Sequence, residues 1–326
     1  MKKLLSIVGA VCALACGMIA PLADALAQDY PARPVRIVVP YAPGGSTDIL
    51  TRILSAKLTT RLGQTVVVDN RAGGNGIIGT EIVAHSPPDG YTFLMVTNGQ
   101  TINVGLHPNL SVDIERDLIP VVNVAAMPNL ILVHPSLPVK TLRNLIDLAK
   151  ARPGSLSYAH AGVGSAQHMA GEFFKLVAKV NIVPVPYKGG GPAVADTIAG
   201  AVEMLVAGVP AVSQYVAAGR LRALAATSLK RSALLPDVPT VAESGYPGFD
   251  AIFWIAIIAP RGTPPAIVQR LNSDANAVMR DPEIEKLFSQ QGAAPAGGTP
   301  AELGAYIRKD IETWTRVIKE ANIKAE

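Results

Sequence analysis

Short aliphatic segments that end in glycine-rich loops and lead into helical segments recur along this chain. The first aliphatic segment covers residues 36–40, the loop YAPGGSTD covers residues 41–48, and apolar residues then return at helical spacing from 49 to 62. Two further aliphatic segments follow at residues 65–68 and 91–96. Because strands that alternate with helices form parallel sheets covered by helices, this order predicts an α/β fold.

The alternation continues through the middle of the chain. We expect strands at residues 130–133, 157–159, 182–186 and 204–206, and helices at residues 142–151, 166–177 and from 192 onward. The apolar segment 250–259 is expected to be extended, and the tail from 264 to be mostly helical, with Trp314 and Ile318 on one face. A chain of 326 residues has room for two domains, and no low-complexity linker separates them. We therefore expect the chain to cross between two domains in folded segments, near 122–132 and 250–259.

The N-terminus has the features of an export signal. The lysines of the opening MKK precede an uncharged apolar stretch at residues 4–15, and residues 25–27 (Ala-Leu-Ala) form a small-x-small cleavage pattern. We expect residues 1–27 to be a signal peptide that is cleaved, so that the mature protein begins at Gln28 in the periplasm. A permanent membrane anchor is the alternative, but the apolar stretch is shorter than the roughly 20 residues that span a bilayer.

Both cysteines of the chain, Cys12 and Cys16, lie within this leader. Cys16 matches the pattern of a lipid-attachment site poorly, and whether it carries a lipid stays open. Cleavage after residue 27 leaves a mature protein without a thiol, which excludes a disulfide, a catalytic cysteine and a cysteine metal site. The mature net charge is about +3, compared with +4 for the whole chain, and the charges form no runs. This weak, dispersed charge favours small anions over nucleic acid as partners.

Four glycine-rich loops follow the carboxyl ends of expected strands, at residues 41–48, 97–101, 162–168 and 187–191. Ligands of open α/β sheets bind at that edge, and three of these loops lead directly into helices, whose free N–H groups and partial positive charge favour an anion. The alternative is that the glycines only form turns. We expect a carboxylate held mainly by backbone N–H groups, with help from Ser46, Thr47, Asn98, Ser165 and Lys188.

Several side chains near these loops have two interpretations that the sequence leaves open. Asp48 either caps a helix or contacts the ligand, where it would attract an amino group and repel a second carboxylate. His168, which flanks one loop opposite His160, either caps or lines that loop or takes part in ligand binding. Four aromatic residues either line a pocket or pack in the core: Tyr41, Tyr187, Phe253 and Trp254.

Motifs for catalysis, metal binding and cofactor binding are absent or incomplete. Residues 74–79 (GNGIIG) match the dinucleotide-binding pattern GxGxxG, but the next expected strand ends in Thr97 and Asn98 instead of the acidic residue that would bind the ribose. No serine lies in a GxSxG motif, no HExxH motif occurs, and the five histidines lack the short spacing of metal ligands. We therefore expect no enzyme activity, no catalytic residue, no cofactor and no metal.

Segments spread over the whole expected mature chain resemble one family. Residues 31–48 (PARPVRIVVPYAPGGSTD) closely resemble the opening of the Bug family, the extracytoplasmic solute-binding proteins of tripartite tricarboxylate transporters. The departures are small: Ala72 stands where the family more often has proline, and residues 201–203 (AVE) replace a usual Gln-Val-Asp. The resemblance continues, in order, through residues 68–74, 88–92, 162–165 with His168, 186–189, 236–240, 243–245 and 260–264.

The resemblance implies a two-domain periplasmic-binding-protein fold of type II, with two crossover strands, that closes on its ligand like a flytrap. In this fold residues 28–127 and 252–326 form domain 1, and residues 128–251 form domain 2. The resemblance also implies that the loops 41–48 and 162–168 hold a carboxylate. Contacts to both domains at once would drive closure, since only a difference in affinity shifts an open–closed equilibrium.

The resulting hypothesis is a monomeric periplasmic protein that captures a small organic carboxylate and delivers it to a permease made of a large and a small membrane subunit. The family's ligands include tricarboxylates, dicarboxylates, acidic amino acids and aromatic carboxylates, and the sequence does not choose among them. A ligand sensor for a membrane histidine kinase is the alternative, and a periplasmic hydrolase would need a nucleophile or metal that the sequence lacks. We expect the ligand to contact Tyr41, Gly44, Gly45, Ser46, Thr47, Asp48, Asn98, Gly164, Ser165, His168, Tyr187, Lys188, Gly189, Val209 and Phe253.

Overall fold

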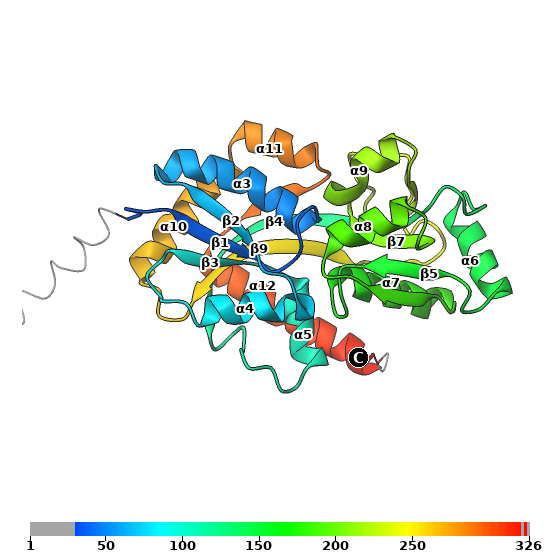
Figure 1. Ribbon diagram of the computed structural model, residues 1–326, viewed down its shortest axis with the longest axis horizontal. Helices are drawn as coiled ribbons and strands as arrows, with labels where there is room; N and C mark the ends of the chain where they lie inside the picture. The colour runs from blue at the N-terminus through cyan, green and yellow to red at the C-terminus, as the bar shows by residue number, and fades with distance from the viewer. Residues whose placement is uncertain (1–29, 321–322, 325–326) are drawn as a thin grey trace, which may run out of the picture.

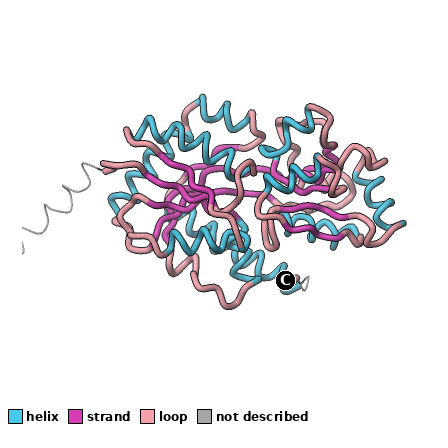
Figure 2. Tube along the Cα trace, viewed as in Figure 1, coloured by secondary structure: helices cyan, strands magenta, loops and turns pink. Residues whose placement is uncertain are grey.

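The structure is a computed structural model of the chain, and it describes residues 30–320 and 323–324. The expected signal peptide, its cleavage site and both cysteines lie outside the described residues. The described chain forms two lobes, each with a sheet flanked by helices, and long strands run from one lobe to the other (Figures 1 and 2). None of the described helices combines the length and the apolar character that a bilayer crossing needs.

Lobe 1 is built on a sheet of β1 (Val35–Val39), β2 (Val66–Asn70), β3 (Thr92–Thr97), β4 (Leu118–Val133), β9 (Ile252–Pro260) and β10 (Ala294–Gly297). The strand order is β2-β1-β3-β9-β4, and β10 also pairs with β4. β1, β2 and β3 run parallel, whereas β9 runs antiparallel to β3 and β4. The expected aliphatic strands are buried, as Val39 and Phe93 illustrate with no exposed surface.

Helices cover both faces of the lobe 1 sheet (Figure 1): α3 (Ser46–Leu62), α10 (Pro265–Met279) and α11 (Pro282–Ser289) on one face, and α4 (Ile77–Ala84), α5 (Asn98–Leu106) and α12 (Pro300–Glu320) on the other. A short 3-10 turn, η1 (Gly74–Gly76), precedes α4. Leu50, Leu54 and Leu58 of α3 pack against the sheet at helical spacing and are fully buried. Trp314 and Ile318 of α12, which the sequence places on one face of a helical tail, are both buried.

Lobe 2 contains the strands β5 (Ser157–His160), β6 (Val183–Pro186), β7 (Met204–Gly208) and β8 (Arg222–Ala226), and the helices α6 (Leu142–Ala151), α7 (Ala166–Ala178), α8 (Gly190–Ile198) and α9 (Val209–Ala217). β5 lies parallel to β6 and β7. The buried residues of α6 and α7 join one core cluster, and those of α8 and α9 join another. The two pairs of helices therefore cover opposite faces of this sheet.

β4 is a single strand of 16 residues that belongs to both lobes. It pairs with β9 as far as Pro128, with β7 from Asn129 onward and with β8 from Leu130 onward. The chain returns through Ala251, whose N–H donates to the carbonyl of Thr227 in lobe 2 before β9 enters lobe 1. The expected architecture of two α/β lobes joined by two crossing segments is present, while the exact domain boundaries stay a prediction.

Some local features differ from the sequence predictions. Residues 97–101, expected as a loop, instead begin α5, because Thr97 caps that helix and Gln100 accepts the Thr97 N–H at 2.8 Å. Likewise α9 begins at Val209, with Pro210 in its first turn. The periodicity did not predict the short strands β8 and β10. The sheets are mixed rather than parallel because the crossing strands run antiparallel to several neighbours.

Candidate functional site

Four helices begin at the wall of one cavity between the lobes, which we call the helix-end cavity. Its volume is about 20 Å³. α3 contributes its first turn from lobe 1, and α7, α8 and α9 contribute theirs from lobe 2. The cavity is lined by Tyr41, Ala42, Gly45, Ser46, Thr47, Asp48, Ala161, Gln167, Gly190, Ala207, Gly208, Ala211 and Phe253.

Backbone donors face this cavity from three of the four helices. The N-cap residues of α3, α8 and α9 are Gly45, Gly189 and Gly208, and none of them supplies a side-chain cap. The first-turn N–H groups of these helices therefore have no intrahelical partner, and three helix dipoles direct partial positive charge toward one cavity. An anionic group such as a carboxylate satisfies both the donors and the dipoles.

The two lobes touch along the loops that border the cavity. The N–H of Ala42 in lobe 1 donates to the carbonyl of Lys188 in lobe 2 at 3.1 Å. A Cβ on Gly191 would lie only 2.1 Å from the carbonyl oxygen of Pro43 across the cleft, so that only glycine permits this approach. The structure is therefore that of a closed cleft. Ser46 adds a second interlobe bond, because its hydroxyl donates to the Gly208 carbonyl at 3.3 Å.

Asp48 lines the helix-end cavity, and its negative charge is compensated within lobe 1. Its carboxylate accepts hydrogen bonds from the Gly44 N–H at 3.0 Å, the Asn70 side chain at 3.0 Å and Arg52 at 3.1 Å. Although burial acts to raise it, these hydrogen bonds lower the pKa of Asp48. Both interpretations of this residue are thus compatible with its position, since it binds the backbone just before α3 and also reaches the cavity.

A second interlobe space, which we call the glycine-loop cavity, adjoins the first and has a volume of about 310 Å³. Tyr41 and Ala161 line both cavities. Lys188 brings a positive charge to it, and no carboxylate is among its described lining residues. Its lining consists of Tyr41, Gly73, Gly74, Asn75, Gly76, Ile77, His107, Ala161, Gly162, Val163, Pro186, Tyr187 and Lys188.

Tyr41 forms the wall between the two cavities. Its hydroxyl lies 3.1 Å from the Thr97 hydroxyl and donates to the Asn75 side-chain oxygen at 3.3 Å. Burial raises the pKa of Tyr41 to about 12, so that the phenol stays neutral and does not repel an anion. Of the two interpretations for this aromatic residue, the structure favours the one in which it forms the pocket.

Two adjacent imidazole rings, tilted by 35° to each other, support the loop between β5 and α7. The rings of His160 and His168 lie 4.5 Å apart, and Nδ1 of His168 accepts the Gly164 N–H at 3.1 Å. Burial lowers the pKa of His168 to about 4 and that of His160 to about 3, so both rings are neutral near pH 7. The Gly164 N–H, which the sequence suggested as an anion donor, is thus engaged by His168 in the closed conformation.

Other predicted contact residues lie behind the cavity walls. Ser165 caps α7 by accepting the His168 N–H at 3.1 Å. Asn98 holds the return strand: it donates to the Ile252 carbonyl at 2.9 Å and accepts the Trp254 N–H at 3.1 Å. The residues Gly44, Asn98, Gly164, Ser165, His168, Gly189 and Val209 are not among the lining residues of either interlobe cavity, and a role in ligand contact stays a prediction for them.

The structure adds two polar residues that sequence reasoning missed. Asn75 reaches the cleft from the glycine loop that resembles a dinucleotide motif, and its positive φ of 48° places the side chain between Tyr41 and Asn103. The position of that loop at a strand end was the available signal. Gln167, in the first turn of α7, lines the helix-end cavity, and no motif marked it.

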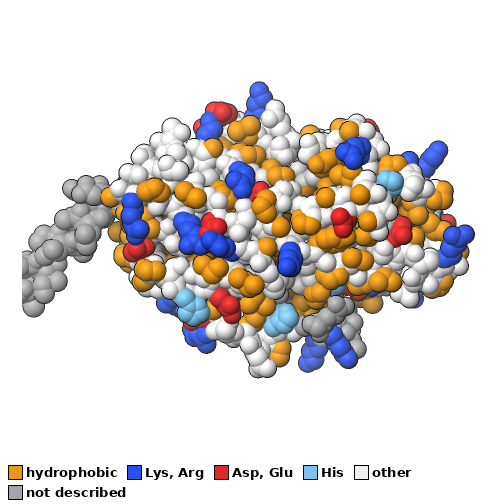
Figure 3. All heavy atoms as spheres, in the orientation of Figure 1, with side chains coloured by type: hydrophobic (Ala, Val, Ile, Leu, Met, Phe, Trp, Pro, Cys, Tyr) orange, Lys and Arg blue, Asp and Glu red, His pale blue; other side chains and the backbone are white. Residues whose placement is uncertain are grey.

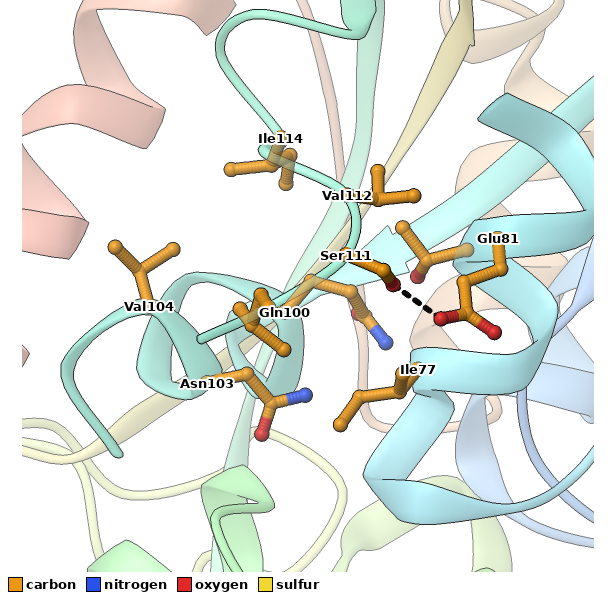
Figure 4. A pocket seen from close by; sticks show the side chains of 10 residues that line it. Ile77, Glu81, Gln100, Asn103, Val104, Ser111, Val112 and Ile114 are labelled. Carbon is orange, nitrogen blue, oxygen red and sulfur yellow. Dashed lines mark hydrogen bonds between the residues drawn. The ribbon is translucent and has the colours of Figure 1, made fainter. Parts of the chain in front are cut away.

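Three further observations concern other kinds of site in the described residues. A cavity of about 20 Å³ in lobe 1, where Ser111 donates to Glu81, is lined by lobe 1 residues alone and cannot link the lobes (Figure 4). On the face in Figure 3, basic and acidic side chains are interspersed and form no single basic patch. Among residues 30–320, no group of three histidine, cysteine, aspartate or glutamate side chains has the arrangement of a metal site.

Comparisons with known proteins agree with this geometry. The sequence profile described as "Tripartite tricarboxylate transporter family receptor" matches residues 50–323. Protein BugT of Bordetella pertussis is 41% identical over 326 residues, which are 99% of each chain. An R. palustris protein solved with adipate aligns with a TM-score of 0.88 at 38% identity, over 91% of this chain and 99% of that chain. The periplasmic binding protein BugD aligns with a TM-score of 0.88 at 34% identity, over 91% and 100%.

These matches bear directly on three predictions from the sequence. The resemblance to the Bug family is confirmed, and so is the two-domain periplasmic-binding-protein fold. The relatives are solute-binding proteins and not enzymes, which confirms the prediction of no enzyme activity.

Proposed function

We propose that this chain, which belongs to the tripartite tricarboxylate transporter receptor family, captures a small organic carboxylate between its lobes in the periplasm and delivers it to the large and small membrane subunits of such a transporter. The protein acts as a monomer, with residues 28–127 and 252–326 in domain 1 and residues 128–251 in domain 2. Residues 1–27 direct its export and are then removed.

One observation carries the proposal: uncapped helix N-termini from both lobes meet at one cavity. α3 belongs to lobe 1, and α8 and α9 belong to lobe 2. A carboxylate that binds all three gains contacts only when the lobes are together, and this difference in affinity shifts the equilibrium toward the closed form. Each charge-assisted hydrogen bond contributes roughly 1.5–3 kcal/mol, so a few of them account for the roughly −8 kcal/mol of micromolar binding.

Each of the two cavities holds a different part of the ligand. The helix-end cavity suits the carboxylate, and the adjoining glycine-loop cavity leaves room for the rest of the molecule. The relative solved with adipate supports an acid as the ligand class. The structure contains no fixed guanidinium among the described lining residues of either cavity, so a second carboxylate would be met by Lys188 or by water.

Isothermal titration of the mature chain against a panel of acids tests the proposal. The panel contains citrate, malate, succinate, adipate, glutamate and benzoate, with glucose and choline as neutral and cationic controls. We expect at least one acid to bind with micromolar affinity and neither control to bind. Heat from glucose or choline, with none from any acid, would contradict the proposal. Retention of the acid-loaded protein by membranes that contain the two permease subunits tests delivery separately.

A further inference from the structure

A pair of buried carboxamides lies at the wall of the helix-end cavity. Gln167 lines that cavity from α7 and is 7% exposed, and its Nε2 donates to Oδ1 of Asn129 at 3.3 Å. Asn129 is fully buried on β4, where its Cα pairs with that of Gly208, another lining residue. The carboxamide of Gln167 is thus held in one orientation by the strand that joins the lobes.

Each carboxamide keeps an unused polar atom. Nδ2 of Asn129 is buried and has no hydrogen-bond partner among the described residues. Among the described residues, the Gln167 side chain makes one hydrogen bond, from Nε2 to Asn129, and its Oε1 receives no donor. Because Gln167 lines the helix-end cavity and Asn129 does not, the contents of the cavity are the expected source of a partner for Oε1.

Two other acceptors at this cavity, Asp48 and the Gly208 carbonyl, are already engaged. Both oxygens of Asp48 accept hydrogen bonds from Arg52, Asn70 and the Gly44 N–H. The Gly208 carbonyl accepts the Ser46 hydroxyl. Oε1 of Gln167 has no donor among the described residues and, unlike the Ser46 and Thr47 hydroxyls of the same lining, can only accept. A carboxylate oxygen placed against it would meet an acceptor rather than a donor, whereas an O–H or N–H group would pair with it.

We propose that Gln167 is a specificity-determining residue that selects carboxylates bearing a hydrogen-bond-donating substituent, a hydroxyl or an amino group, and that Asn129 is a positioning residue that orients Gln167. This inference rests on the proposed function, since it assumes that the carboxylate itself is held by the helix N-termini. The donor of the substituent pairs with Oε1 of Gln167, and the bond from Nε2 to Asn129 fixes the direction in which Oε1 points.

Matched pairs of acids test the inference by titration calorimetry on the mature chain. The pairs are succinate with each enantiomer of malate, succinate with aspartate, and glutarate with 2-hydroxyglutarate. We expect at least one substituted acid to bind about tenfold more tightly than its unsubstituted partner, because that acid alone pairs with Oε1. In Gln167→Met, which has a similar volume and no carbonyl, this ratio of affinities should fall to near one, while the unsubstituted acid binds within about threefold of its original affinity.

Two further variants separate a specific role from a structural one. Gln269→Met makes the same change on the exposed face of α10 and should leave the ratio unchanged. Asn129→Leu should lower the ratio because it frees the Gln167 side chain, whereas a merely structural effect would weaken both acids equally and preserve the ratio.

The outcomes distinguish the two proposals. Unsubstituted acids that bind as tightly as every substituted partner, or an unchanged ratio in Gln167→Met, would overturn this inference and leave the carboxylate-binding function standing. Failure of every acid in the pairs and in the wider panel to bind would overturn the proposed function, and this inference with it.

Discussion

The backbone N–H of Ala42 in lobe 1 donates to the carbonyl oxygen of Lys188 in lobe 2, 3.1 Å away. This bond joins two loops that approach so closely that Gly191 has no room for a side chain. The closed cleft therefore depends on backbone contact between the lobes as well as on the ligand, and its stability is open to test by small substitutions.

Gly191→Ala should weaken ligand binding without unfolding the protein. The added methyl group would lie 2.1 Å from the Pro43 carbonyl oxygen, so the lobes could not close fully. We expect a loss of affinity of at least tenfold by calorimetry, and a radius of gyration by X-ray scattering that no longer decreases when ligand is added. Gly304→Ala on α12 is the control, because its Cβ would make ordinary contact at 3.4 Å. Equal effects of the two variants would argue against the interlobe contact.

Arg52→Met should reduce the affinity for acids by about fivefold, because Asp48 would keep its charge beside the bound carboxylate with less compensation. Arg52 pairs with Asp48 at 2.9 Å, and the Asp48 side chain is only 6% exposed. Arg143→Met breaks a similar i,i+4 pair with Asp147 on the surface of α6, and should leave affinity unchanged. An unchanged affinity in Arg52→Met would show that Asp48 does not influence the ligand.

The buried pair His160 and His168 should make the protein less stable in acid. Burial lowers the pKa of His168 to about 4 and of His160 to about 3, whereas an unfolded chain has a histidine pKa of about 6.5. The unfolded state therefore binds more protons than the folded state below about pH 6.5. As the pH decreases further, the free energy of unfolding decreases by up to about 1.4 kcal/mol per pH unit for each histidine.

His168→Gln tests this dependence, because its carboxamide can still accept the Gly164 N–H but does not titrate. The free energy of unfolding in urea, measured from pH 7 to pH 4, should decrease less steeply in this variant than in the native chain. His134→Gln, which changes a loop histidine outside the pair, should keep the native slope. A native slope in His168→Gln would rule out this linkage.

The effect of Asp310 on the pH dependence of stability should be opposite to that of the histidines. Burial raises its pKa to about 6, against the hydrogen bond from Thr101, so the folded state binds the proton more readily than the unfolded chain does. Its carboxyl group therefore destabilises the protein above pH 6, and this effect fades as pH falls toward 4. Asp310→Asn should raise the unfolding free energy by about 1–2 kcal/mol at pH 7.5 and by much less at pH 4. The same change at both pH values would contradict this view.

The parts of the fold set by local periodicity were predictable from the sequence. The buried runs around Val39 and Phe93 became strands, and the 3.6-residue spacing of Leu50, Leu54 and Leu58 became the buried face of α3. The start of α5 was not predictable in this way. The loop expected there contains a glycine, but the capping bonds of Thr97 with Gln100 outweigh the turn preference of that glycine.

The candidate site was predictable at the level of loops and less so at the level of side chains. Gly45 and Ser46 line the cleft because strand ends and helix starts place them there, which is a consequence of topology. The bond from Gly164 to His168 and that from Gln167 to Asn129 depend on tertiary packing, which no spacing rule encodes. For the same reason Gly164→Val is a poor test of binding, since a Cβ there would lie 2.6 Å from Leu106 and disturb the packing directly.

β4 is a continuous strand that takes part in the sheets of both lobes. Its partners change between Pro128 and Asn129, and Pro128 has no N–H with which to hold the ladder at that point. We expect the lobes to open by bending of β4 between Pro128 and Asn129. Faster amide exchange near Asn129 when ligand is withdrawn would detect this bending. Each lobe would then move as a rigid body while keeping its own sheet intact, so the energy that ligand binding must supply is that of bending the two crossing segments and not of unpairing two sheets.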